Sequence, residues 1–239
     1  MRKEGGKRDV LYGRNPVREA LRAGRRRVHR VLATPGAAKE GWLAGARVEV
    51  VGPQDVEDRC GSREHQGICA EVDPYPYAGA AELLARPDPL LVALDEVQDP
   101  QNLGAIARTA ECAGADGVIV PERRSADVTP AAVKASAGAV EHLPVARVRN
   151  LADFLAEAKA AGCWCYGADG SATARYDQPD YSGGVVLVVG AEGKGLRPRV
   201  ASSCDSLVSI PLQGRIQSLN VSAATAIILF EISRCRGFA

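Results

Sequence analysis

No apolar run in this chain is long enough to cross a lipid bilayer. The longest runs, such as residues 185–189 and 226–230, are only a few residues long, whereas a membrane helix needs about 20. The first residues, MRKEGGKRD, also lack the apolar segment that follows the charges of a secretory signal. We therefore expect a cytoplasmic protein without a membrane span.

Regular cysteine spacing is also missing, which argues against a disulfide framework. The seven cysteines are an odd number scattered along the chain, as is typical of proteins from a reducing cytosol. Cys163 and Cys165 are the only close pair, and the alternating pattern around them predicts a strand. We therefore predict buried thiols here and no metal site.

The usual nucleotide-binding glycine motifs are absent. The glycine-rich segment at 188–196, VVGAEGKGL, lacks the Gly-x-x-x-x-Gly-Lys-Ser/Thr spacing of a phosphate-binding loop, because its lysine is followed by Gly195 and Leu196. No Gly-x-Gly-x-x-Gly follows a first strand either, which disfavours a dinucleotide fold. Three glycines after an apolar strand still predict a sharp turn or a close approach to a ligand.

Acidic residues are scarce in residues 1–30, which contain three of them against eleven lysines and arginines. This segment carries a net charge of +8, although the whole chain carries only +1. A basic segment of this density predicts a surface for a polyanion. A solvated face that only aids solubility is the alternative at this stage.

The hydrophobic pattern predicts two α/β units. A flexible basic tail (1–8) precedes a small unit (9–73), in which Asn15 caps a helix and Pro16 is its first residue. A turn-rich linker (74–88) leads to a larger unit (89–239). There, apolar strands alternate with helices, which predicts a buried parallel sheet covered on both faces. The strands are expected at 90–94, 117–120, 164–168, 185–189 and 207–210, and the helices near 103–113, 131–137, 151–161, 197–202 and 219–234.

Three loops leave the carboxyl ends of these strands, where such sheets bind ligands. In the first, Asn102 can cap a helix, and Arg108 lies one to two turns further on. A guanidinium beside free helix amides suits a phosphate, although a plain capped helix with a surface arginine is the alternative. The second loop is the glycine-rich segment.

The third loop precedes the last helix and contains more polar side chains than one helix cap requires. Its polar residues are Gln217, Ser218, Asn220 and Ser222. Serine and asparagine cap free helix amides, and the surplus indicates a binding site at the helix entrance.

Together the three loops resemble the motifs of a known family. Asn-x-Gly-x-x-x-Arg, Val-Val-Gly-x-Glu-Gly-x-Gly-Leu and Ile-Pro-Leu-x-Gly-x-Ile-x-Ser-Leu-Asn-Val-Ser occur here in that order. They are similar to the motifs of the SpoU (TrmH-like) RNA ribose 2′-O-methyltransferases of the SPOUT superfamily, over residues 90–236. Upstream, Tyr12-Gly13 and His65-Gln66-Gly67 resemble that family's L30e-like RNA-binding domain. The two-domain layout is most similar to bacterial 23S rRNA guanosine-2′-O-methyltransferases.

The resemblance implies an enzyme with a trefoil-knotted C-terminal α/β domain that forms a homodimer through that domain. It implies S-adenosylmethionine as the cofactor and RNA, specifically 23S rRNA, as the substrate. By position in the motifs, the cofactor-binding residues would be Gly190, Ala191, Glu192, Ile210, Leu212 and Leu219. The catalytic residues would be Arg108, Glu192, Ser218 and Asn220. RNA would contact Asn102 and the N-terminal Arg14, Arg25, Arg26 and Arg27.

Two alternatives remain at this stage. One is the same chemistry at another rRNA or tRNA site, including antibiotic-resistance methylation. The other is a non-catalytic RNA-binding factor in ribosome assembly, against which the full set of motif residues counts.

Overall fold

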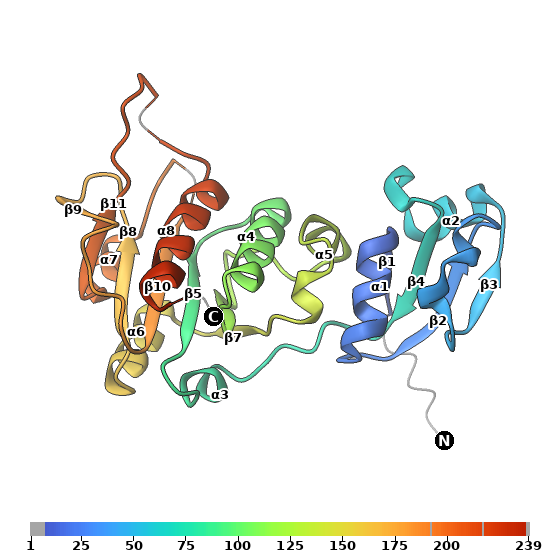
Figure 1. Ribbon diagram of the computed structural model, residues 1–239, viewed down its shortest axis with the longest axis horizontal. Coiled ribbons are helices and arrows are strands. Elements are labelled where there is room, and N and C mark those ends of the chain that lie inside the picture. The colour runs from blue at the N-terminus through green and yellow to red at the C-terminus, as the bar shows by residue number, and fades with distance from the viewer. Residues whose placement is uncertain (1–7, 192, 217, 238–239) are drawn as a thin grey trace.

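The chain forms two α/β parts that lie side by side along the long axis of the molecule (Figure 1). The computed structural model describes residues 8–191, 193–216 and 218–237. The first sheet contains four strands and the second contains seven. A small α/β domain followed by a larger one with a parallel sheet confirms the predicted fold class.

The N-terminal part is a mixed sheet with strand order β1-β4-β2-β3. In it, β4 pairs antiparallel with both β1 and β2, and β3 pairs parallel with β2. Its elements are β1 (Asp9–Tyr12), α1 (Arg14–Ala23), β2 (Val28–Ala33), β3 (Val48–Val50), α2 (Pro53–Cys60) and β4 (Ile68–Val72).

The first helix begins earlier than its sequence suggests. Gly13, not Asn15, precedes α1, so that Pro16 lies inside the first turn. Gly13 has a φ of 95°, and a Cβ atom there would lie 2.5 Å from Nζ of Lys134 in the other part of the chain. The Lys134 side chain could move aside, but the positive φ itself favours glycine where the chain turns into the helix.

The segment predicted as a linker packs against the C-terminal part. Ala78 forms an isolated bridge with Ala146. Tyr75 is buried, and its hydroxyl donates to the carbonyl of Val140 at 3.0 Å and accepts from the amide of Val145 at 3.2 Å. This segment is consequently an ordered edge of the second sheet, followed by the short helix α3 (Ala80–Leu84).

The C-terminal sheet is parallel throughout, with strand order β7-β6-β5-β10-β8-β11-β9. Continuous Val, Ile and Leu in the central strands allow helices to cover both faces. The strands are β5 (Leu90–Asp95), β6 (Gly117–Pro121), β7 (Val145–Val148), β8 (Trp164–Ala168), β9 (Ala174–Arg175), β10 (Val185–Gly190) and β11 (Ser206–Ser209). The helices are α4 (Pro100–Cys112), α5 (Pro130–Ala135), α6 (Leu151–Ala160), α7 (Pro198–Ser203) and α8 (Val221–Cys235).

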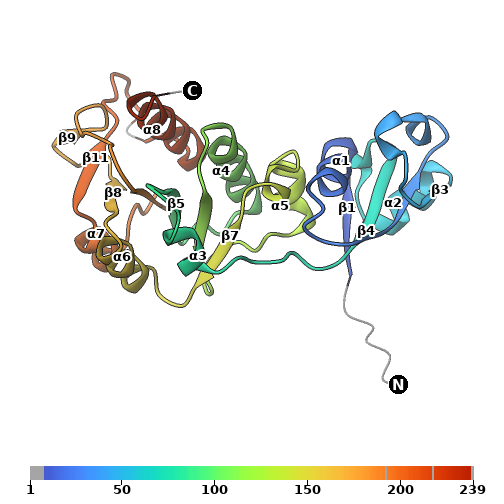
Figure 2. The ribbon, with the colours of Figure 1, turned by 60° about the horizontal axis from the view of Figure 1, so that its bottom comes forward.

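Each face of the sheet has its own core. Alternate residues of β5, such as Val92 and Leu91, belong to different hydrophobic clusters because successive side chains point to opposite faces. Helices α4 and α8 cover one face, and α3, α6 and α7 cover the other, whereas α5 packs between α4 and the N-terminal part (Figure 2). Cys163 and Cys165 are buried in the second cluster, which confirms the predicted buried thiols.

Some elements differ from the sequence-based expectation. Strands β1, β7 and β9 were not predicted, since they are short strands at the sheet edges without long apolar runs. Helix α4 starts at Pro100, and the carboxylate of Asp99, not the amide of Asn102, caps it by accepting from the Gln101 amide at 2.9 Å. No helix in the described ranges is long and apolar enough to span a membrane.

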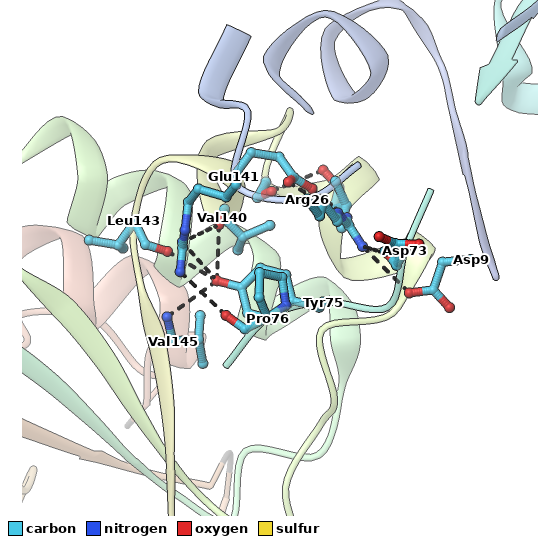
Figure 3. A network of polar contacts seen from close by, with 12 residues as sticks. Asp9, Arg26, Asp73, Tyr75, Pro76, Val140, Glu141, Leu143 and Val145 are labelled. Carbon is cyan, nitrogen blue, oxygen red and sulfur yellow. Dashed lines mark hydrogen bonds and ion pairs between the residues drawn. The ribbon is translucent and has the colours of Figure 1, made fainter. Parts of the chain in front are cut away.

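A buried ion pair joins the two parts of the chain (Figure 3). The guanidinium of Arg26 binds both carboxylate oxygens of Glu141, with Nε donating at 3.2 Å, and both side chains are 1% exposed. Nη1 also donates to the carbonyl of Asp73 at 3.2 Å. Arg25 lies beside this pair and donates to the carbonyl of Val140 at 3.4 Å. These contacts fix the orientation of the N-terminal part relative to the C-terminal part.

Candidate active site

A cavity of about 240 Å³ opens at the carboxyl ends of β8, β10 and β11, beside the first turns of α8. Its position follows the rule that parallel sheets bind ligands beyond the carboxyl ends of their strands. All the predicted cofactor-binding residues that the structure describes line this cavity, and so does Ser218. They are Gly190, Ala191, Ile210, Leu212 and Leu219. Glu192, predicted as both a catalytic and a cofactor-binding residue, lies outside the described residues.

The backbone of the glycine-rich loop forms one wall of the cavity. A Cβ atom at Gly190 would lie 2.2 Å from the carbonyl carbon and oxygen of Gly195, so no side chain fits there. The amide of Gly195 donates to the carbonyl of Ala191 at 2.9 Å and closes the turn. Gly193 and Gly195 have φ angles of 76° and 65°, which favour glycine.

The opposite wall is the loop before α8. Within its described part (211–216 and 218–219), no main-chain group forms a hydrogen bond with another main-chain group. Leu212 and Leu219 are 38% and 39% exposed on this wall. The loop therefore presents apolar side chains and available amide and carbonyl groups together, a combination suited to a ligand with an aromatic base and polar edges.

Asn220 connects two of the three motifs. It caps α8, because its Oδ1 accepts from the Ser222 amide at 2.9 Å. Its Nδ2 donates to Oδ1 of Asn102, in the first turn of α4, at 3.1 Å. The surplus of polar residues before this helix thus supplies both a cap and a link to the first motif.

A second hollow adjoins the first cavity on the side of this asparagine pair. We call the first one the cofactor-type cavity, because the predicted cofactor-binding residues line it. The second hollow is lined by Asn102 and Lys194, and it shares Ala191 and Val221 with the first cavity. Lys194 is exposed and was not selected from the sequence, although it belongs to the glycine-rich loop. A substrate group placed in this hollow would lie directly beside the cavity.

Arg108 is not brought into either cavity. It follows Asn102 by six residues on α4, about 9 Å along the helix axis, and it lines neither hollow. Its side chain is exposed, and within the described ranges it makes no hydrogen bond or ion pair. The guanidinium is therefore available to a ligand that extends beyond the cavity.

Asp169 is a cavity residue that the sequence analysis missed. It follows β8 and accepts at Oδ1 from the amide and hydroxyl of Ser171, at 2.8 and 2.6 Å. The hydrogen bond from the Ser171 side chain lowers the pKa of this carboxyl below its ordinary value. The signal was available, since Asp169-Gly170 directly follows a predicted strand at its carboxyl end.

The four predicted RNA-contacting arginines of the N-terminal part fall into two groups. Arg14 and Arg27 are exposed, and Arg14 pairs with Glu40 at 2.8 Å. Arg26 is buried against Glu141 and Arg25 is held at the domain junction. For Arg26 the prediction is wrong, because its guanidinium faces the interior and not the surface. The first segment's positive charge therefore serves partly to join the domains.

The comparison with protein families agrees with this geometry. The model of the SpoU rRNA Methylase family matches residues 89–230. The chain belongs to this family. A second model, described as RNA 2′-O ribose methyltransferase substrate binding, matches residues 10–78. The two matches correspond to the larger and the smaller sheet.

Individual SpoU-family relatives are similar over most of their length. YacO of Bacillus subtilis, assigned to the TrmH family of tRNA/rRNA methyltransferases, is 37% identical over 95% of this chain and 96% of its own. An uncharacterized tRNA/rRNA methyltransferase of Mycobacterium avium is 41% identical over 95% of this chain and 78% of its own.

Solved structures of SpoU methyltransferases share the fold. AviRb of Streptomyces viridochromogenes, in complex with AdoMet, superposes with a TM-score of 0.80 at 28% identity and covers 95% of this chain and 90% of its own. An AdoMet-bound rRNA methyltransferase of Sinorhizobium meliloti superposes with a TM-score of 0.80 at 31% identity, covering 95% and 87%. This protein is a methyltransferase that uses S-adenosylmethionine and acts on RNA, as predicted.

Proposed function

We propose that this SpoU-family enzyme methylates a ribose 2′-hydroxyl in structured RNA, and that the nucleotide is a guanosine of 23S rRNA. The observation that carries the proposal is the asparagine pair, Asn102 and Asn220, beside a cavity with glycine-backbone and apolar walls. The domain matched by the RNA 2′-O ribose methyltransferase substrate-binding model supports ribose as the acceptor.

The cavity would hold the cofactor through its main chain. Gly190 and Ala191 would face it from one wall, and Ile210, Leu212 and Leu219 from the other. Asp169 has a carboxylate in the same lining, where it can accept hydrogen bonds from hydroxyl or amino groups. When bound, S-adenosylmethionine supplies a methyl group on a sulfonium, which a hydroxyl oxygen can attack.

The residues around the asparagine pair would position the nucleotide. Ser218 and Asn220 would orient the ribose, and Glu192 is assigned to the nucleotide or a proton relay from its place in the motif. Holding a hydroxyl in line with the reacting carbon can supply much of a rate enhancement. Asn102, already hydrogen-bonded to Asn220, would fix the amide orientation at this site.

Arg108 would hold the RNA phosphate next to the reacting ribose and stabilise negative charge on the oxygen as its proton leaves. A guanidinium remains protonated in proteins, so this role fits it better than that of a proton acceptor. Arg108→Lys keeps the charge but removes bidentate binding. We expect turnover on RNA to fall by about 10-fold or more, with the affinity for S-adenosylmethionine unchanged. Wild-type turnover would contradict the phosphate role.

A homodimer through the C-terminal part belongs to the same proposal. Helix α8 exposes Ile227 and Phe230, at 38% and 43%, and a second copy of the chain would cover such apolar side chains. Equilibrium sedimentation tests this, and a monomer at micromolar concentration would contradict it.

Substrate transcripts identify the RNA. The protein is incubated with labelled S-adenosylmethionine and, separately, with unmodified 23S rRNA, 16S rRNA and tRNA. Label in 23S rRNA alone is the expected result. Label in another RNA would replace the guanosine assignment, and binding to RNA without any transfer would favour an assembly factor.

A further inference from the structure

A third hollow, of about 310 Å³, lies at the same edge of the C-terminal sheet and is lined by five arginines. They follow the carboxyl ends of β6, β7 and β10, and they are Arg123, Arg124, Arg149, Arg197 and Arg199. No acidic residue is among the described residues that line it. We call this hollow the arginine cavity.

Carboxylates neutralise only some of these arginines. The ion pairs are Arg124–Glu96 at 3.2 Å, Arg197–Asp95 at 2.7 Å, Arg197–Glu96 at 3.4 Å and Arg199–Asp153 at 2.8 Å. Arg123 and Arg149 are exposed and form no ion pair with any residue that the structure describes. The cavity therefore has positive charge that the chain itself does not compensate, which favours an anionic ligand.

Arg197 is held in place by a buried carboxylate, and Arg124 lies on unusual backbone. Asp95 is buried at the end of β5, and it accepts from both the amide and Nε of Arg197, at 2.8 and 2.7 Å. Glu96 and Arg124 both adopt left-handed backbone, with φ of 59° and 60°, which is uncommon for residues with a side chain. Arg197 directly follows the glycine-rich loop, so one short segment connects the arginine cavity and the cofactor-type cavity.

The arginine cavity lies between the N-terminal part and the cofactor-type cavity along the strand order. The segment after the first sheet pairs with β7 through Ala78 and Ala146, whereas the cofactor-type cavity is at β10, β8 and β11. From β7 to β10 are three strand spacings, about 14 Å. Glu96, which binds Arg124, also lines the hollow that contains Asn102. The three hollows thus follow one edge of the sheet.

We propose that the arginine cavity binds phosphodiester groups of the substrate RNA, between the part held by the N-terminal domain and the nucleotide being methylated. This rests on the proposed function. Guanidinium groups match phosphate oxygens with paired hydrogen bonds and retain their charge at all physiological pH values. The methyltransferase domain would therefore grip the RNA backbone itself and would not rely on the basic N-terminal segment alone.

The test uses the two arginines without ion pairs. Arg123→Gln/Arg149→Gln is compared with wild type for binding to a 23S rRNA transcript between 50 and 200 mM salt, without cofactor. The salt slope is the steepness with which the logarithm of the affinity falls with the logarithm of the salt concentration, and each lost phosphate contact lowers it by about 0.7 for single strands. We expect a slope smaller by about 1.4, so that wild type loses about sevenfold more affinity than the variant over this range. KM for RNA should rise, with kcat at saturating RNA unchanged.

Matched controls separate position from charge. Arg86→Gln/Lys159→Gln removes the same charge from the opposite edge of the sheet, where Arg86 binds Asp116 and Lys159 binds Asp205. It should leave the salt slope unchanged. Arg123→Lys/Arg149→Lys keeps the charge and should restore most of the slope.

An unchanged slope in the glutamine variant, or an equal decrease in both glutamine variants, would overturn the proposal. If millimolar inorganic phosphate weakens RNA binding by wild type but not by the glutamine variant, the result supports a phosphate site. If RNA affinity does not change with the cavity variants, the site is assigned to a free anion and the RNA role is overturned. Binding is measured without methyl transfer. A protein that methylates none of the RNAs would therefore refute the proposed function, whereas the comparison of salt slopes would still test the arginine cavity.

Discussion

Replacing Arg26 with methionine removes one partner of the buried ion pair that joins the two domains. The variant keeps most of the side-chain volume but leaves the carboxylate of Glu141, which is 1% exposed, without the guanidinium that holds both its oxygens. Breaking a buried pair from one side costs about 3–5 kcal/mol. In a chain of this size that corresponds to a Tm lower by about 6–20 °C.

Differential scanning calorimetry measures this effect. Because Arg26 lies in the N-terminal part and Glu141 in the C-terminal part, we expect the variant to unfold at a lower temperature and with its two parts less coupled. Arg26→Met/Glu141→Leu should recover much of the loss, since replacing both members by apolar groups is often neutral or stabilising. Arg27→Met, at an exposed neighbouring position, is the control and should change stability by less than about 0.5 kcal/mol. A loss below about 1 kcal/mol for Arg26→Met would refute the reasoning.

Three further changes test other parts of the structure. Gly190→Ala places a methyl group 2.2 Å from the Gly195 carbonyl, so the loop must shift; calorimetric titration should show at least about 10-fold weaker cofactor binding, with stability lower by about 1–3 kcal/mol. Asn220→Ala should cost about 1 kcal/mol in urea unfolding through the lost cap, whereas Asn220→Asp keeps the cap but cannot donate to Asn102 and should lower turnover more than stability. The hydrogen bond from Arg30 is the main reason that the pKa of Glu71 is about 2. Because the pKa of this carboxyl is higher in the unfolded chain, the ionised Glu71 stabilises the fold fully above about pH 5, and this stabilisation is lost as the pH falls toward 2. Glu71→Gln should therefore weaken the dependence of the free energy of unfolding on pH over that range.

Each of these three predictions has an outcome that would contradict it. Gly36→Ala, where a Cβ meets nothing within 4 Å, should bind the cofactor normally, and equal binding by the Gly190 variant would refute the backbone-contact argument. Wild-type turnover in Asn220→Asp would show that donation to Asn102 has no role. An unchanged acid dependence in Glu71→Gln would show that other carboxyl groups dominate.

The cofactor-type cavity was predictable because its information is local. Gly190 ends an apolar strand, Ile210 follows one, and Leu219 lies in the loop that leaves the second and enters α8. The carboxyl-end rule brings such loops together without knowledge of the strand order, and the resemblance to the family motifs selects the residues within them. Asp169 obeys the same rule and could have been included. The start of α4 was also readable, since Asp99-Pro100 is a cap followed by a proline in the first turn.

The domain junction was not predictable in the same way. Arg26 looks like part of a solvent-exposed basic run, and its partner Glu141 is 115 residues away. The arginine cavity likewise combines residues from three separate segments of the chain, and none of these segments is rich in basic residues over its whole length. Such long-range pairings depend on strand order, which local patterns do not specify.

The position of the transferred methyl group tests the central claim most directly. Label from S-adenosylmethionine is transferred to 23S rRNA, and the RNA is then hydrolysed with alkali, which cleaves only where a free 2′-hydroxyl is present. The account predicts that label is retained in an alkali-resistant dinucleotide whose 5′ member is guanosine, and that Arg108→Lys greatly reduces it. Label recovered in single nucleotides, on the base, would contradict ribose methylation.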